Sequence, residues 1–535
     1  MLFTHLYFWG FFSVVLLGYT FIYKVNRARS IYLLLFSFFF YYKTNGVFIT
    51  LLLFTIVSDF CWGKQIHKSN NPLHKKLFLL MSVLLNLSLL CYFKYSYFFV
   101  SSGSELLGTN TTYINHFAGF SNTFFGTEFR MDKLLTPIGV SFFTFQSLSY
   151  TMDVYRGKVK PVDSIFDYGF FVCFFPHLVA GPIVKANEFL YQIYKPYNLT
   201  RIEFGMAAFW IMNGFSKKIV ADYIAVNFID RVFSSPHLYT GVETVIAIFA
   251  YSLQVYMDFS GYTDIAIGIA LLLGYRLKTN FKSPYKALST SEFWKRWHIS
   301  LSSWLQEYLY IPLGGNKEGS IGSYICIFII SLFLVLISGK LWLLFFLMGF
   351  FLLLIFIAIL FPKIKQHITT NINLMVTMLL GGLWHGSSAL FLIWGGLNGL
   401  GLIVHKFWQK ISPFKNTTNI GIKIALMLFT LSFISFTRIY FRSPNMDIVN
   451  QIFDRINNHF SLYLLFDVIH GYWIVLLIVL LGYLIHWIPE TNKEKYRNYF
   501  AGLPLPIMAL GCCLIVFCLY QIMSSEMQPF IYFQY

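Results

Sequence analysis

The sequence contains few charged residues. They make up 12% of its 535 residues, about half the share found in an ordinary soluble domain. Hydrophobic residues make up 57%, and apolar runs recur from residue 6 almost to the end of the chain. A soluble core cannot bury that much apolar surface, so the sequence predicts an all-α polytopic membrane protein. Disordered, fibrous and small-module classes are excluded.

Cysteines at paired loop spacing are also missing. All seven cysteines lie in or beside apolar runs, where cysteine behaves as a small core residue, so a disulfide scaffold is excluded. The sequence shows no convincing internal repeat, which lowers the expectation of a transporter built from duplicated halves.

Basic residues outnumber acidic ones. The chain has 40 Lys and Arg against 23 Asp and Glu, for a net charge of +17. These bases lie in short loops between apolar runs, where they orient a membrane protein and meet anionic headgroups. The lipid bilayer is therefore the expected partner, and nucleic acid is not.

The distribution of apolar runs predicts the topology. Residues 6–23 form an uncleaved span that begins outside, because basic residues follow it and none precedes it. Residues 31–42 and 47–62 are short and meet at Asn45–Gly46, which predicts a hairpin. Residues 77–100 cross outward, residues 101–129 form an external loop, and residues 134–152 cross back. Further spans are expected at 168–184 (possibly re-entrant), 205–221, 242–274, 322–338, 341–361, 374–404, 422–441, 463–488 and 503–523, giving roughly ten to thirteen.

No soluble domain interrupts these runs. We expect one membrane domain over 1–535, with N-terminal helices over 1–130, a core over 131–445 and C-terminal helices with an aromatic tail over 446–535.

The first segment of chemical interest is Ser291 to Gly315. On a helical wheel, one stripe holds aromatic and aliphatic side chains, namely Trp294, Trp297, Leu301, Trp304, Leu305 and Tyr308. The opposite face holds Lys295, Arg296, Ser303, Gln306 and Glu307. This pattern predicts an interfacial helix with His298 at the edge of the aromatic stripe. It fits a belt helix at headgroup level, or a ledge where Lys295 and Arg296 meet an anionic phosphorylated donor.

The second segment is Met375 to Asn398. His385 lies within an apolar span, beside glycines whose small-xxx-small spacing lets helices approach closely. A buried imidazole is costly there, so His385 is either a hydrogen-bonded packing residue or a functional one. Two histidines without Cys, Asp or Glu at ligand spacing make a poor metal site. Neither segment carries a nucleophile elbow or a phosphate-binding loop. What remains is a histidine general base, which suits attack of a hydroxyl on a thioester.

Two further features accompany the histidines. Asp258 and Asp264 lie in one apolar run, six residues apart, and either orient a histidine or cap a helix. The chain ends in PFIYFQY (529–535), which the last span would deliver to the outer side. An aromatic tail is typical of an interfacial anchor, yet a tyrosine phenol, with a pKa of about 10, is a better leaving group than a sugar hydroxyl. An acyl-tyrosine would therefore stay reactive.

The segments FWKRWHISLSSWLQEYLYIPLGGN, GGLWHGSSALFLIWGGLNG and DFSGYTDIAIG resemble the membrane-bound O-acyltransferase superfamily. The bacterial branch that acetylates alginate or peptidoglycan is the most similar. The segments PIGVSFFTFQSLSY (137–150), FFPHLVAGPI (174–183) and NFKSPY (280–285) add to the resemblance.

This resemblance implies a ring of tilted helices around a central funnel that admits the donor from the cytoplasm. It implies His385 as the catalytic residue, His298 as the second signature residue, and Tyr532 as a proposed acyl carrier in the tail. Trp384 is expected to support the site. Lys295, Arg296, Trp297 and Trp304 are expected to bind acetyl-CoA or another acyl thioester, with no bound cofactor or metal.

The resulting hypothesis is acetyl transfer across a bacterial inner membrane, with both termini periplasmic. A periplasmic esterase- or transferase-type partner would pass the acetyl group to a cell-envelope polysaccharide. The alternatives are a transporter or flippase for lipid-linked sugars, a structural subunit of a secretion complex, and a lipid or protein O-acyltransferase.

Overall fold

The computed structural model describes residues 3–415 and 417–523, and this part of the chain contains helices and no strand. The chain forms two compact units, and each unit is built from several stretches. Unit 1 comprises residues 1–199, 273–277 and 306–368; unit 2 comprises residues 200–272, 278–305 and 369–535. The sequence predicted three consecutive parts, divided at residues 130 and 445. That division stays a prediction, because each unit combines stretches from different parts of the chain.

Unit 1 contains the N-terminal helices and a later apolar pair. Its elements are α1 (Leu6–Ile22), α2 (Asn26–Asn45), η1 (Gly46–Phe48), α3 (Ile49–Lys68), α4 (Pro72–Leu107), α5 (His116–Phe125), α6 (Val140–Tyr155), α7 (Ile165–Cys173), α8 (Phe175–Leu178), α9 (Ala186–Ile193), α15 (Ile321–Ser338) and α16 (Trp342–Leu360). Two elements cross the boundary between the units, η5 (Leu305–Tyr310) and α17 (Pro362–His385).

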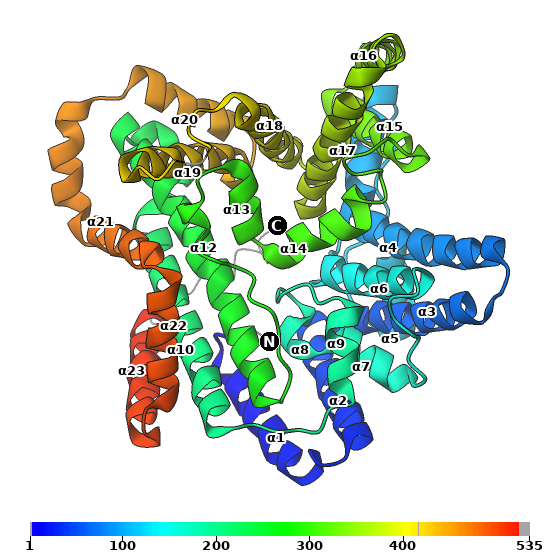
Figure 1. Cartoon of the computed structure of the whole chain (residues 1–535), viewed down its shortest axis with the longest axis vertical. Coiled ribbons are helices and arrows are strands. Elements are labelled where there is room, and N and C mark those ends of the chain that lie inside the picture. The colour runs from blue at the N-terminus through cyan, green and yellow to red at the C-terminus, as the bar shows by residue number, and fades with distance from the viewer. Residues whose placement is uncertain (1–2, 416, 524–535) are drawn as a thin grey trace. The chain divides into compact units, whose positions relative to one another are not determined.

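Unit 2 contains the helices that carry both histidine motifs. Its elements are α10 (Arg201–Ile224), η2 (Ala225–Ile229), α11 (Asp230–Ser234), η3 (Pro236–Leu238), α12 (Gly241–Leu272), η4 (Pro284–Lys286), α13 (Thr290–Arg296), α14 (Ile299–Trp304), α18 (Ala389–Ile411), α19 (Ile420–Arg442), α20 (Met446–Asn458), η6 (Leu462–Leu464), α21 (Leu465–Trp487), α22 (Glu490–Gly502) and α23 (Leu505–Met523). Helices α10 and α12 lie side by side (Figure 1).

The helices confirm a polytopic membrane protein. Seven helical segments of the described chain are long and apolar enough to cross a membrane, or eight if the bent pair α22–α23 is one span. Two shorter apolar helices are Leu6–Ile22 and Trp342–Leu354. The predicted ten to thirteen also counted shorter or more polar segments, such as α6, α10 and the pair α7–α8.

The helix boundary predicted at Asn45–Gly46 is confirmed, whereas the hairpin stays a prediction, because residues 26–68 form one apolar helical segment. α2 and η1 meet at Asn45–Gly46, and Gly46 has a φ of 57°, a value that favours glycine. The external loop predicted over 101–129 is partly wrong. α4 continues to Leu107, and α5 forms within the loop after the Asn115 side chain accepts a hydrogen bond from Ala118 N at 3.1 Å.

Glycines bring α10 and α12 into backbone contact within unit 2. A Cβ atom at Gly214 would lie 2.5 Å from the carbonyl oxygen of Gly261, and one at Gly268 would lie 2.7 Å from that of Ala207. Both distances are too short for any side chain, so the packing of these two helices depends on glycine. α12 is buried along most of its length.

The single span predicted over 374–404 is wrong, because the segment forms two helices. α17 ends at His385, and Ser388 caps α18 by accepting a hydrogen bond from Leu390 N at 3.2 Å. A glycine and a capping serine at this point interrupt the helix although the apolar pattern continues. His385 therefore lies at a helix end beside a turn.

The close approach that the glycine spacing predicted is confirmed between α17 and α18. A Cβ atom at Gly382 would lie 2.3 Å from the carbonyl oxygen of Phe391, and one at Gly395 would lie 2.5 Å from that of Met378. The two helices therefore touch through their backbones directly beside His385.

Substituting Gly382 by Ala should destabilise the protein, because the new methyl group must push α18 away. We expect a cost of about 1–3 kcal/mol, seen as a lower thermal midpoint of the full chain in detergent. Gly349→Ala in α16 is the matched control, since a Cβ atom there meets nothing within 4 Å. Equal midpoints for the two variants would contradict the tight crossing.

Candidate active site

The interfacial helix predicted within the segment Ser291 to Gly315 is interrupted at His298. α13 ends at Arg296, and α14 begins at Ile299. His298 lies between them in the left-handed region, with φ 44° and ψ 54°, a conformation that costs energy for a residue other than glycine. The expectation of one continuous amphipathic helix is therefore wrong.

The loop before α13 holds this break in place. The side-chain oxygen of Asn280 accepts hydrogen bonds from the backbone N–H and the hydroxyl of Ser300, each at 3.0 Å. The backbone N–H of Ile299 donates to the carbonyl oxygen of Asn280 at 2.9 Å. The apolar periodicity of Ser291 to Gly315 could not predict this contact, because Asn280 lies in a different segment.

His298 is buried in unit 2, with 1% of its surface exposed. Its Nδ1 atom lies 3.3 Å from Asn280 Oδ1, and its ring centre lies 4.7 Å from that of Phe259. Burial lowers the pKa of His298 to about 3, because the imidazolium form would lose its hydration. The imidazole is therefore neutral at physiological pH.

His385 lies among aromatic rings at the end of α17. Its ring centre is 5.2 Å from those of Trp394 and Phe441 and 4.9 Å from that of Trp384. The Trp384 ring also lies 6.3 Å from the His298 ring, so it contacts both histidines. The side chain predicted to support the site thus lies beside both of them.

Both histidines line one partly open cavity of about 20 Å³ within unit 2. That volume holds about one water molecule. The lining residues are Val255, Phe293, Trp294, Trp297, His298, Leu301, His385, Trp394, Asn398, Ile434, Thr437, Arg438 and Phe441. The structure therefore brings together the two motifs that the sequence singled out separately.

Arg438 and Asn398 belong to this site, and the sequence interpretation missed them. The Arg438 guanidinium lies 4.4 Å from the centre of the Trp297 ring. Asn398 donates a hydrogen bond to the Trp394 carbonyl oxygen at 2.8 Å. Arg438 falls inside the predicted span 422–441, and a charged residue within a span is by default a functional candidate. Arg438 lies close to the end of this apolar run, where it resembles the basic residues that flank a membrane span.

The residues predicted to bind the donor are divided between surface and interior. Lys295 is exposed, and Arg296 pairs with Glu292 at 2.7 Å. Trp297 and Trp304 are buried, and of these two Trp297 lines the cavity. The basic pair thus faces outward while Trp297 faces the histidines.

Asp258 and Asp264 lie inside α12, so neither caps a helix end. Asp258 accepts a hydrogen bond from Lys218 at 2.7 Å, and Asp264 accepts one from Lys217 at 2.6 Å. Both lysines belong to α10, so these ion pairs join the same two helices that the glycines bring together.

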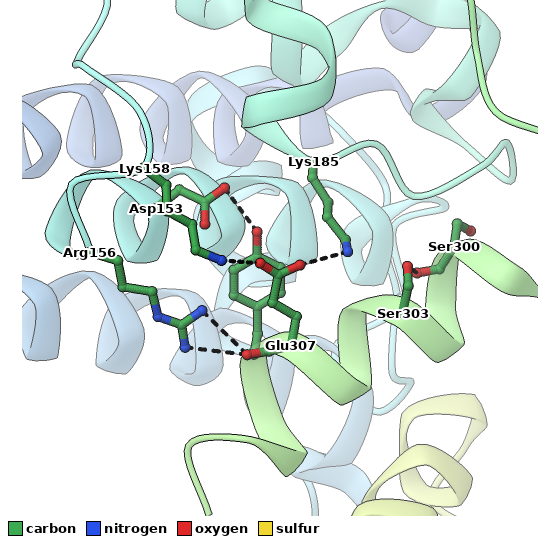
Figure 2. A network of polar contacts seen from close by, with 8 residues as sticks. Asp153, Arg156, Lys158, Lys185, Ser300, Ser303 and Glu307 are labelled. Atoms are coloured by element: carbon green, nitrogen blue, oxygen red, sulfur yellow. Dashed lines mark hydrogen bonds and ion pairs between the residues drawn. The ribbon is translucent and has the colours of Figure 1, made fainter. Parts of the chain in front are cut away.

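Unit 1 contains a second polar cluster, shown in Figure 2, around Glu307. The carboxylate accepts hydrogen bonds from Lys158 and, at 2.8 Å, from Lys185, while Arg156 donates to the Glu307 carbonyl oxygen. Burial favours the neutral acid, but the bonds from the two lysines outweigh it and lower the pKa of Glu307 to about 2. Tyr308 donates to Asp153 at 3.0 Å.

Tyr532 lies outside the described residues. Within residues 3–415 and 417–523, no three or more histidine, cysteine, aspartate or glutamate side chains are grouped to hold a metal ion.

Comparison with known proteins identifies the chain's family. Residues 38–362, a range that includes His298 and ends before His385, match the MBOAT, membrane-bound O-acyltransferase family. The chain belongs to this family. It is therefore an O-acyltransferase, and the transporter and structural-subunit alternatives lose their support.

Relatives extend the similarity over most of the chain. The probable alginate O-acetylase AlgI of Pseudomonas syringae is 32% identical over 80% of this chain and 70% of the relative. The peptidoglycan O-acetyltransferase of Helicobacter pylori is 31% identical over 83% of this chain and 77% of the relative. The teichoic acid D-alanyltransferase of Bacillus subtilis is 24% identical over 52% of this chain and 61% of the relative.

The lowered pKa of His298 predicts a specific loss of stability in acid. The unfolded imidazole takes up a proton below its ordinary pKa of 6.5, whereas the folded one resists protonation down to about 3. Stability should therefore fall as the pH drops through this window. Thermal midpoints of the full chain in detergent, measured from pH 7 to about pH 4.5, should fall less steeply for His298→Gln than for the wild type. His367→Gln, at an exposed site on α17, should keep the wild-type slope.

Proposed function

We propose that this O-acyltransferase transfers an acetyl group from acetyl-CoA for O-acetylation of a cell-envelope polysaccharide. The observation that carries the proposal is the placement of His298 and His385 on one cavity. A buried imidazole beside a second, neutral imidazole can remove a proton from a hydroxyl that attacks a thioester.

The names of the relatives support a glycan acceptor. Two relatives that cover most of this chain are named for acetylation of alginate and of peptidoglycan. Both polymers offer sugar hydroxyls, so we infer a hydroxyl of an alginate-like exopolysaccharide or of peptidoglycan as the final acceptor.

The size of the cavity supports acetyl as the transferred group. A volume of about 20 Å³ beside the histidines has room for about one water molecule, so a long acyl chain does not fit there. A lipid or protein acyltransferase must instead bury a long acyl chain close to the reacting carbonyl. The structure therefore favours acetyl transfer over this alternative within the enzyme class.

The proposed roles follow from the placement of each side chain. His385 takes the proton from the acceptor hydroxyl while that oxygen forms a bond to the thioester carbon. The carbon–sulfur bond then breaks, and the thiolate leaves with the proton that His385 returns. His298, held by Asn280 and neutral, orients the reacting groups.

The donor and acceptor are proposed to reach the site from opposite sides. The exposed Lys295 and the neighbouring Arg296 supply positive charge for the phosphates of coenzyme A at the cytoplasmic face of the inner membrane. Tyr532 is proposed to accept the acetyl group on the periplasmic side, where both termini would lie. A periplasmic esterase- or transferase-type partner would then pass it to the polysaccharide.

His385→Ala should abolish acetylation of the polymer in cells while the variant protein remains folded. We expect a loss of at least about 100-fold, the usual contribution of a positioned general base. His367→Ala is the matched control, because His367 lies on the same helix and is exposed. Full activity of His385→Ala would rule out the mechanism.

Mass spectrometry tests whether Tyr532 in the C-terminal tail carries the acetyl group. After incubation of the purified full chain with acetyl-CoA, the C-terminal peptide should gain one acetyl group on Tyr532, and His385→Ala should show none. Tyr535→Phe should keep the adduct, and Tyr532→Phe should lose it. Consumption of acetyl-CoA without any adduct on the tail would instead indicate direct transfer to the acceptor.

A further inference from the structure

Arg438 is a buried cation without a carboxylate partner. It lies in α19 with 5% of its surface exposed. In the part of the chain that the structure describes, no aspartate or glutamate forms an ion pair with it. A lone charge is costly inside an apolar membrane unit, so a residue of this kind usually has a function.

Other cations of unit 2 that are buried or partly buried are neutralised. Lys217 pairs with Asp264 at 2.6 Å, and Lys218 pairs with Asp258 at 2.7 Å. Arg442, one helical turn after Arg438, pairs with Asp230 at 2.8 Å. Arg438 therefore differs from its neighbours in keeping its charge available for a ligand.

The surroundings of Arg438 fix its orientation. Its guanidinium lies against the Trp297 ring, at 4.4 Å, and near the Tyr285 ring, at 5.3 Å. One terminal nitrogen donates to the Ser252 carbonyl oxygen at 3.1 Å and to the Tyr285 hydroxyl. Cation–π contact and two hydrogen bonds thus hold the plane of the group rigidly.

Part of the guanidinium stays available to a substrate. An arginine carries five N–H donors, and the two hydrogen bonds use those of one terminal nitrogen. Among residues 3–415 and 417–523, no acceptor is bonded to the other nitrogens. Arg438 lines the cavity that also holds His298 and His385, so these donors are within the reaction site.

We propose that Arg438 is a catalytic residue that binds the carbonyl oxygen of the acyl thioester as that oxygen becomes negative. The inference rests on the proposed acyl transfer and deepens it. When the acceptor oxygen bonds to the carbonyl carbon, one electron pair of the C=O bond moves onto oxygen, and the hydroxyl proton moves to His385. The pair returns as the C–S bond breaks. Arg438 donates hydrogen bonds throughout and neither gains nor loses a proton.

A fixed cation is suited to this step. A preorganised donor in a site that excludes water stabilises the developing oxyanion without reorganising. A neutral imidazole at His298 offers a single N–H and no charge, so it cannot replace the guanidinium in this role.

The experiment compares the full chain with Arg438→Met and Arg438→Lys in proteoliposomes that contain acetyl-CoA, an acceptor glycan and the proposed periplasmic partner. We expect kcat of Arg438→Met to fall by about 100- to 1,000-fold, as for other oxyanion donors, while KM changes little. Arg438→Lys keeps the charge but not the planar fork and should show an intermediate loss. Added guanidinium ion at low millimolar concentration should restore part of the activity of Arg438→Met.

Arg442→Gln is the matched control, because it removes a paired arginine of the same helix that does not line the cavity. It should keep kcat near the wild-type value and show no response to guanidinium. Thermal midpoints verify that each variant folds. If Arg438→Met does not fold, the kcat of Arg438→Lys decides whether Arg438 acts in catalysis.

Failure of the proposed role of Arg438 and failure of the proposed function give different results. If wild type consumes acetyl-CoA and His385→Ala does not, but both Arg438 variants keep wild-type kcat, the role of Arg438 is overturned and the proposed function stands. A loss in Arg438→Met that guanidinium leaves unchanged, with a lowered midpoint and full activity in Arg438→Lys, would reduce Arg438 to a packing residue. Absence of acetyl-CoA consumption by wild type would overturn both proposals.

Discussion

The arrangement of unit 2 depends on the contact between α10 and α12. Two features fix their register together: glycines that let the backbones touch, and adjacent lysines that each pair with an aspartate on the facing helix. Sliding α12 by one turn would break both pairs and remove Asp264 from Lys217, at a cost of several kcal/mol, whereas Lys218 would keep Asp222 of its own helix. α12 carries Val255, which lines the cavity, and Phe259, which packs on His298. The charge pairs therefore position the walls of the active site without entering it.

The break at His298 has a consequence for the cavity. In an uninterrupted helix, Trp297 and His298 would point about 100° apart, whereas the break changes the direction of the chain between α13 and α14. The left-handed conformation at His298 brings the two side chains onto the same cavity, and the Asn280 hydrogen bonds offset the strain of about 1–3 kcal/mol. Trp297 in turn supports the Arg438 guanidinium. The strained residue thus lies where a neutral imidazole, an aromatic ring and a cation meet.

Features encoded within one segment were predictable from the sequence. The helix boundary at Asn45–Gly46, the glycine-dependent crossing beside His385 and the choice of both histidine motifs required only local patterns. The helix break at His298 depends on Asn280, which belongs to another segment. Apolar periodicity within one segment does not predict such a contact. Arg438 sits close to the end of an apolar run, where arginine commonly marks the membrane boundary. Arg438 lies beside the histidines because of the way α19 packs, and no local sequence pattern predicts that packing.

The small aromatic site also bears on the choice between transfer and hydrolysis. A histidine base that activates a hydroxyl would activate water equally well, and water attack on a thioester would waste the donor. A cavity of about 20 Å³ leaves space for about one water molecule, the same space that an attacking hydroxyl oxygen would fill. Binding of the acceptor therefore displaces the competing nucleophile. On the proposed mechanism, transfer is favoured over hydrolysis once the acceptor is bound, because its hydroxyl oxygen takes the place of the water.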